Sequence, residues 1–256
     1  MAIARTANPA LNKKTFTGFQ VADSTSAMTI QGTVNKIFIM LLLVLAGALY
    51  TWRLAFDAMQ ADSIEASRAI LPWMIGGGLG GFILALITVF KRTWAPVTGP
   101  VYAILEGLFL GGISAYLEFL YPGIVMQAVA LTLGILFALL MAYKSRLIKP
   151  TKNLRLGIVA ATGGVMLLYM FSFLLNLFGI PVGYLHSNSL LSIGINLVIV
   201  VIAALNLVLD FDFIEQGAAS NAPKYMEWYA AFGLMVTLIW LYIEILRLLS
   251  KIASRR

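Results

Sequence analysis

The chain of 256 residues contains no cysteine, a single histidine and few charged residues, which make up 11% of the sequence. The absence of cysteine excludes disulfides, thiolate metal sites and cysteine nucleophiles. His186 has no second ligand nearby, so we do not expect it to hold a metal ion. No phosphate-binding loop, serine-hydrolase, zinc-peptidase or dinucleotide motif occurs in a suitable context. We therefore expect neither an enzyme nor a bound cofactor.

What the chain has in abundance is apolar residues, which account for 61% of it and give a mean hydropathy of +0.91. In soluble domains apolar residues make up roughly 45–50% of the chain. Seven apolar stretches of about 20 residues use nearly the whole length, which predicts an all-α integral membrane protein, a bundle of seven transmembrane helices. The net charge of +7 does not indicate nucleic-acid binding, because the cations stand at span ends and form no single basic face.

We expect a polar N-terminal arm over residues 1–33 and a transmembrane domain over residues 34–256. The arm lacks an apolar core followed by a cleavage site, which argues against a signal peptide. Glycines in the second span stand four residues apart and allow close approach of another backbone, and the third span carries Gly107, Gly111 and Gly112. The predicted spans cover about 37–52, 69–90, 101–121, 124–143, 156–178, 190–209 and 228–249.

The distribution of cations predicts how the spans are oriented. Basic residues follow the second span, at Lys91 and Arg92, and the fourth, over residues 144–155. The N-terminus and the even-numbered loops are therefore expected in the cytoplasm, with the protein in the inner (plasma) membrane. The C-terminal cations break the pattern, since seven crossings would place them outside. Either the last span does not cross fully or the charge bias is overruled.

Three acidic residues in the last two spans are the main functional clue: Asp210, Asp212 and Glu244. A carboxylate within the bilayer costs roughly 2.5–3.5 kcal/mol on insertion scales, so it normally faces a bundle interior or a water-filled path for ions or protons. Asn206 shares a helix face with Asp210, whereas Asp212 lies about 200° around the helix and should be the more solvated of the two. Alternatively, span six ends at Leu209 and both aspartates are hydrated at the interface.

Glu244 also has two interpretations. It either pairs with Arg247, one turn later, at the membrane interface, or meets Asp210 inside the bundle. Two carboxylates that meet in a low dielectric tend to share a proton, so their protonation would switch helix contacts. Glu106 lies about ten residues into span three, and three interpretations are open for it. It borders the same bundle interior as Asp210 and Glu244, it makes an ion pair between helices, or it packs in a glycine-lined seam.

The segments LVLDFDFIE (207–215) and LYIEILRLL (241–249) resemble motifs of the transmembrane Bax-inhibitor-motif family, in its bacterial YccA-like branch. The glycine-rich stretch 107–112, followed by residues 128–132 and Phe137, is similar to an earlier family pattern. Asp210 best matches the family's span-six aspartate, because Ile214 then falls where the family has isoleucine. Asp212 is the close rival, and Glu244 takes the place of an aspartate in span seven.

The resemblance implies a seven-helix bundle with the C-terminal helix at its centre and the activity of a pH-sensitive calcium leak. It makes Asp210 and Glu244 the expected calcium ligands, with carbonyls and waters completing the shell. We therefore expect a cation leak channel or exchanger that senses pH and has lipid, calcium or protons as its partners. The alternative is an interaction protein whose N-terminal arm lets it modulate a membrane quality-control protease.

Overall fold

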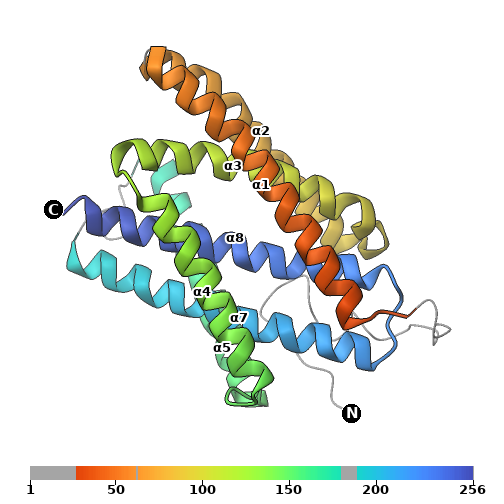
Figure 1. The fold of residues 1–256 in the computed structure, drawn as a ribbon. Coiled ribbons are helices and arrows are strands. Elements are labelled where there is room, and N and C mark those ends of the chain that lie inside the picture. The colour runs from red at the N-terminus through yellow and green to blue at the C-terminus, as the bar shows by residue number, and fades with distance from the viewer. Residues whose placement is uncertain (1–26, 62, 180–188, 256) are drawn as a thin grey trace. The chain divides into compact units, whose positions relative to one another are not determined.

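The computed structural model describes residues 27–61, 63–179 and 189–255, and these are almost entirely helical (Figure 1). The prediction of an all-α membrane protein is confirmed, since seven helices are long and apolar enough to cross a membrane. A short 3₁₀ helix, η2, precedes α3. The elements are α1 (Ile30–Ala61), α2 (Ser63–Phe90), η2 (Arg92–Trp94), α3 (Ala95–Leu120), α4 (Ile124–Lys144), α5 (Lys152–Leu177), α7 (Leu190–Ala219) and α8 (Met226–Ala253).

The chain divides into two compact parts, to which α7 and α8 both contribute. The α1–α3 part contains α1, α2 and α3 with residues 214–235, and the α4–α5 part contains α4 and α5 with residues 190–213 and 236–255. The buried share of the most apolar stretch is 61% in α8 and at most 44% in the other six helices. The resemblance implies a C-terminal helix at the centre of the bundle, and α8 is accordingly the most buried of the seven helices.

Glycines hold the helices of the α1–α3 part close together. A Cβ added at Gly107 or Gly111 of α3 would run into the backbone of α1, at Val44 and Ala48 respectively. A Cβ at Gly77 of α2 would meet the carbonyl oxygen of Leu105. Small residues at such contacts let backbones approach and increase van der Waals packing, which stabilises helix pairs in lipid. The role predicted for the glycines of span two is confirmed at Gly77, and the glycines of span three pack in the same way.

Polar side chains fix the register of the α4–α5 part. Arg155 of α5 forms an ion pair with Asp212 of α7. Two turns further along α5, Thr162 Oγ1 accepts a hydrogen bond from the side-chain amide of Asn206 on α7. Residue numbers rise along α5 while they fall along α7, so the two helices are antiparallel. Hydrogen bonds and ion pairs within a membrane are costly to lose, because lipid offers no replacement partner.

Several helix ends differ from those that hydropathy predicts. α1 begins at Ile30, so the last four residues of the predicted N-terminal arm are helical, and residues 1–26 of the arm lie outside the described residues. α7 continues ten residues beyond Leu209, to Ala219. The chain turns only near Asn221, which has φ 51°, and Pro223. Helices end at such stop signals and not where apolar composition ends.

The last helix bears on the conflict between the C-terminal charges and seven crossings. α8 is unbroken over 28 residues, which corresponds to about 42 Å at 1.5 Å per residue. The hydrocarbon core is only about 30 Å thick. The length of α8 is therefore sufficient for a full crossing.

Candidate functional site

Glu244 lies at the junction of three helices in the α4–α5 part. Its side chain is only 2% exposed. Oε1 accepts a hydrogen bond of 2.7 Å from the hydroxyl of Tyr169 on α5, and Oε2 accepts one of 2.8 Å from the amide of Asn196 on α7. A single carboxylate on α8 therefore holds donors from both neighbouring helices. We call Glu244, Tyr169, Asn196 and Arg247 the Glu244 hub.

Arg247 supplies the positive charge of the hub. Its Nη1 lies 3.3 Å from Glu244 Oε1 and 2.7 Å from the Tyr169 hydroxyl oxygen. The guanidinium carbon stands 5.4 Å from the centre of the Tyr169 ring, within range of a cation–π contact. The arginine side chain is 42% exposed. The hub thus joins a buried anion to a cation that reaches outward, and the predicted Glu244–Arg247 pair is present.

A second cation follows one turn after Arg247. The ammonium group of Lys251 donates a hydrogen bond of 2.9 Å to Ser192 Oγ, near the start of α7, and both residues are buried. The contact joins α8 to α7 four residues before Asn196 on α7 and seven residues after Glu244 on α8. Together these contacts define the antiparallel register between the C-terminal half of α8 and the N-terminal half of α7.

The two aspartates of α7 are both buried, although hydropathy alone allows them to be hydrated at a helix end. Asp210 is 1% exposed. Asp212, expected to be the more solvated, is also buried, and its Oδ2 lies 2.6 Å from Nη2 of Arg155 on α5. The helix continues past both residues, so neither stands at its end. Asn206 points to Thr162 and to the carbonyl of Ile202.

The expected meeting of Asp210 with Glu244 is wrong. Glu244 contacts Asn196, which precedes Asp210 by fourteen residues on the same unbroken helix. That separation is about 21 Å along the helix axis, far beyond the reach of two side chains. Asp210 and Glu244 therefore neither share a proton nor form a two-ligand calcium site. Among the residues that the structure describes, no three His, Asp or Glu side chains gather as metal ligands.

Glu106 belongs to the α1–α3 part and faces a glycine. A Cβ added at Gly81 of α2 would lie 2.6 Å from Glu106 Oε1, and the adjacent Gly107 packs on α1. Of the sequence-based alternatives for Glu106, the glycine-lined seam agrees with this contact. His186, for which no metal role is expected, lies outside the described residues.

A second buried carboxylate, Glu227, ties the start of α8 to the start of α1. Its Oε1 accepts hydrogen bonds of 2.9 Å from both the backbone N–H and the hydroxyl of Thr29 and lies 3.0 Å from Lys224 Nζ, while Oε2 pairs with Lys36. The carboxylate occupies the space that a side chain at Gly32 would need. We call Glu227, Thr29, Lys36 and Lys224 the Glu227 clamp.

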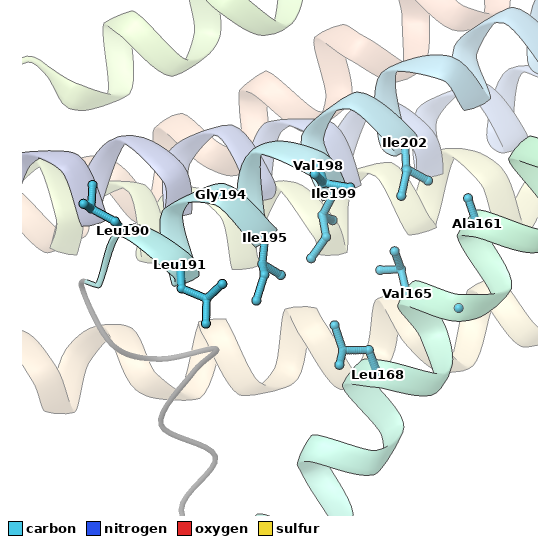
Figure 2. A pocket seen from close by; sticks show the side chains of 11 residues that line it. Ala161, Val165, Leu168, Leu190, Leu191, Gly194, Ile195, Val198, Ile199 and Ile202 are labelled. Carbon is cyan, nitrogen blue, oxygen red and sulfur yellow. The ribbon is translucent and has the colours of Figure 1, made fainter.

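An apolar pocket lies between α5 and α7 (Figure 2). Its volume is about 720 Å³, and side chains such as Val165 and Leu168 from α5 and Ile195 and Ile199 from α7 line it. All eleven lining residues are apolar or glycine. Because a metal cation needs oxygen or nitrogen ligands, these side chains do not make the pocket a cation site.

A family model described as Bax inhibitor 1 like matches residues 8–254, essentially the whole chain. The chain belongs to the Bax inhibitor 1 like family. No curated protein and no solved structure gives a significant match.

Sequence reasoning overlooked several partners in this Bax inhibitor 1 like protein: Tyr169, Asn196, Arg155, Thr162 and Glu227. Asn196 is a polar residue within an apolar run and could have been noted on that ground. Tyr169 offers no such signal, because tyrosine is common in membrane spans. Arg155 reads as the last cation of a basic loop, and only the structure assigns it to Asp212.

The contact between Arg155 and Asp212 yields a first prediction. Arg155→Gln and Asp212→Asn should each lower the thermal unfolding midpoint of the detergent-purified protein, because each leaves a charge without its partner. Breaking one side of a buried pair costs about 3–5 kcal/mol. The double variant should lose less than the two single losses combined, by a coupling of about 1–3 kcal/mol.

Lys152→Gln is the matched control, since Lys152 lies on the same turn of α5 but is exposed. It should leave the midpoint nearly unchanged, and intrinsic tryptophan fluorescence on heating measures the four variants and the unsubstituted protein. Additive losses in the double variant would show that the Arg155–Asp212 pair does not exist in the folded protein.

Proposed function

We propose that this Bax inhibitor 1 like protein is a pH-sensitive calcium (cation) leak channel or exchanger, controlled by protonation of a buried carboxylate. The observation that supports the proposal is the Glu244 hub, in which one carboxylate holds α5, α7 and α8 together. A carboxylate at membrane depth is unfavourable and typically marks an ion or proton path. The resemblance of the last two spans to Bax-inhibitor motifs suggests calcium as the ion.

Protonation of Glu244 would weaken the hub. The neutral acid no longer attracts Arg247, and its protonated oxygen becomes a donor that cannot accept from Tyr169 or Asn196 as the carboxylate does. The other oxygen still accepts, so one of the two helices α5 and α7 loses its acceptor on α8. We expect this loss to loosen the three helices and to let water and cations pass, so flux should rise as pH falls.

α7 carries two buried carboxylates, Asp210 and Asp212. Asp212 already has a counter-charge, because it pairs with Arg155. Calcium prefers six to eight oxygen ligands, so a passing ion would need water and backbone carbonyls as well as any carboxylate. The proposal therefore concerns transient passage and not a resident calcium ion. Glu244 acts in it as the pH-sensitive residue and not as a partner of Asp210.

The test is calcium flux into proteoliposomes that contain an entrapped dye, at acidic and alkaline pH. The unsubstituted protein should conduct more at acidic pH. Glu244→Gln should conduct at alkaline pH as the unsubstituted protein does at acidic pH, because glutamine keeps the shape of the protonated acid but does not titrate.

Glu215→Gln is the control, since Glu215 is an exposed carboxylate on α7, and it should keep the normal pH response. If no calcium flux responds to pH in the unsubstituted protein, the proposed function is wrong. If Glu244→Gln responds to pH normally, Glu244 is not the group that senses pH.

A second candidate function is that of a membrane interaction protein that modulates a membrane quality-control protease. The Glu227 clamp favours it, because residue 29, at the end of the polar arm, is anchored directly to α8. The preceding residues also touch the α7–α8 turn, where Met28 N–H donates to the Ala222 carbonyl and Ala27 bridges Pro223. A partner that holds the arm would thus be linked to the helix that carries Glu244.

Deletion of residues 1–25 tests this candidate. The truncated protein should lose co-purification of its membrane protein partner while keeping pH-dependent flux in proteoliposomes, since the Glu227 clamp stays intact. Thermal unfolding of the truncated protein checks that it folds. Unchanged co-purification after the deletion would contradict a role of the arm in partner binding.

A further inference from the structure

The turn between α4 and α5 carries several basic residues and no acidic residue. Lys144, Arg146, Lys149 and Lys152 are all exposed. The sequence contains no Asp or Glu between Glu118 and Asp210. Arg155, the next cation, is bound to Asp212 and is not counted here. We call the four exposed cations, together with Leu147, the basic turn.

The basic turn stands at the level of lipid headgroups. One membrane span ends at Lys144 and the next begins at Lys152, so only seven residues lie between them. Ammonium and guanidinium groups at span ends reach the phosphate layer of whichever leaflet they enter. This position follows from the two helices and does not depend on which side of the membrane the turn occupies.

Backbone hydrogen bonds give the basic turn a defined shape. Arg146 N–H donates to the Tyr143 carbonyl and Ile148 N–H to the Ala142 carbonyl, which wraps the turn over the last residues of α4. Arg146 has φ 60°, a left-handed conformation that glycine adopts without cost but that strains other residues. The chain thus places a long cationic side chain where local conformation favours glycine.

Leu147 is the second unusual feature, because it is 82% exposed between flanking cations. An exposed leucine at the interface gains by entering the acyl region beneath the headgroups, as apolar residues of membrane-surface segments do. The rule that cations remain in the cytoplasm requires charge only. It explains neither the exposure of Leu147 nor the conformation of Arg146.

We infer that the basic turn is a binding surface for anionic phospholipid headgroups, with its four cations contacting the phosphates and Leu147 inserted below them. Charge complementarity selects the ligand, since the turn is uniformly positive and faces the lipid surface. A Lys or Arg near an anionic membrane surface strengthens association by about fivefold. Loss of all four cations should therefore remove most of the preference for anionic lipid.

The absence of native cysteine allows a direct test. A nitroxide on Leu147→Cys reports its depth through its relative accessibility to oxygen and to a water-soluble nickel complex. The full-length protein is compared in nanodiscs of phosphatidylcholine and in nanodiscs that also contain phosphatidylglycerol. The label should lie deeper when phosphatidylglycerol is present. Both leaflets of a nanodisc have the same composition, so the result does not depend on the orientation of the chain.

Two treatments should abolish this difference. One is neutralisation of the four cations, by Lys144→Gln, Arg146→Gln, Lys149→Gln and Lys152→Gln together. The other is 1 M salt, which reduces the Debye length to about 3 Å and needs no altered chain if the neutralised variant fails to fold. Leu131→Cys, near the middle of α4, is the control label, because it is exposed and lies thirteen residues before Lys144, the first cation of the basic turn.

The Leu131→Cys label should report the same depth in both lipid mixtures. The inference is overturned if the label at 147 lies equally deep with and without phosphatidylglycerol, or if its shift persists in the neutralised variant or in high salt. Calcium flux plays no part in this measurement. The experiment therefore tests the lipid-binding surface independently of the proposed calcium leak.

Discussion

The cost of holding a carboxylate at membrane depth shapes the α4–α5 part of this protein. Lipid cannot solvate an ion, so the chain must supply every donor and counter-charge that Glu244 requires. It does so with one residue from each neighbouring helix, Tyr169 and Asn196, and with Arg247 from the next turn of α8. The same requirement that keeps Glu244 stable therefore sets how α5, α7 and α8 meet. Any change in its charge must alter all three contacts together.

The Glu227 clamp applies the same principle to the other part of the chain. There a buried carboxylate has two lysines and two donors of Thr29, and no residue with an apolar side chain could replace it without leaving those groups unsatisfied. α8 carries Glu227 in its first turn and Glu244 seventeen residues later. One continuous helix thus carries both the Glu227 clamp and the Glu244 hub. A partner bound to the N-terminal arm would therefore act on the same helix as the proposed pH-sensitive residue.

Much of the fold was predictable from the sequence, because spans of apolar residues and glycine seams depend on local composition. The buried acids could also be located on α7 and α8. Their partners could not, since the register between two antiparallel helices depends on side-chain contacts such as Asn196–Glu244 that no spacing rule reveals. A shift of fourteen residues along α7 separates the predicted partner Asp210 from the observed one. Helix ends were similarly missed where the backbone continues through charged residues, as at Asp210 and Asp212.

The account depends most on the claim that protonation of Glu244 releases α5 from α8. Nitroxides at Phe173→Cys on α5 and Ile252→Cys on α8, both exposed positions of a chain without native cysteine, allow pulsed electron paramagnetic resonance to measure the distance between these helices. The account predicts a longer distance at acidic than at alkaline pH, and the longer distance at both pH values when Glu244→Gln is added. The same distance at both pH values without that substitution, or an unchanged pH response with it, would contradict the account.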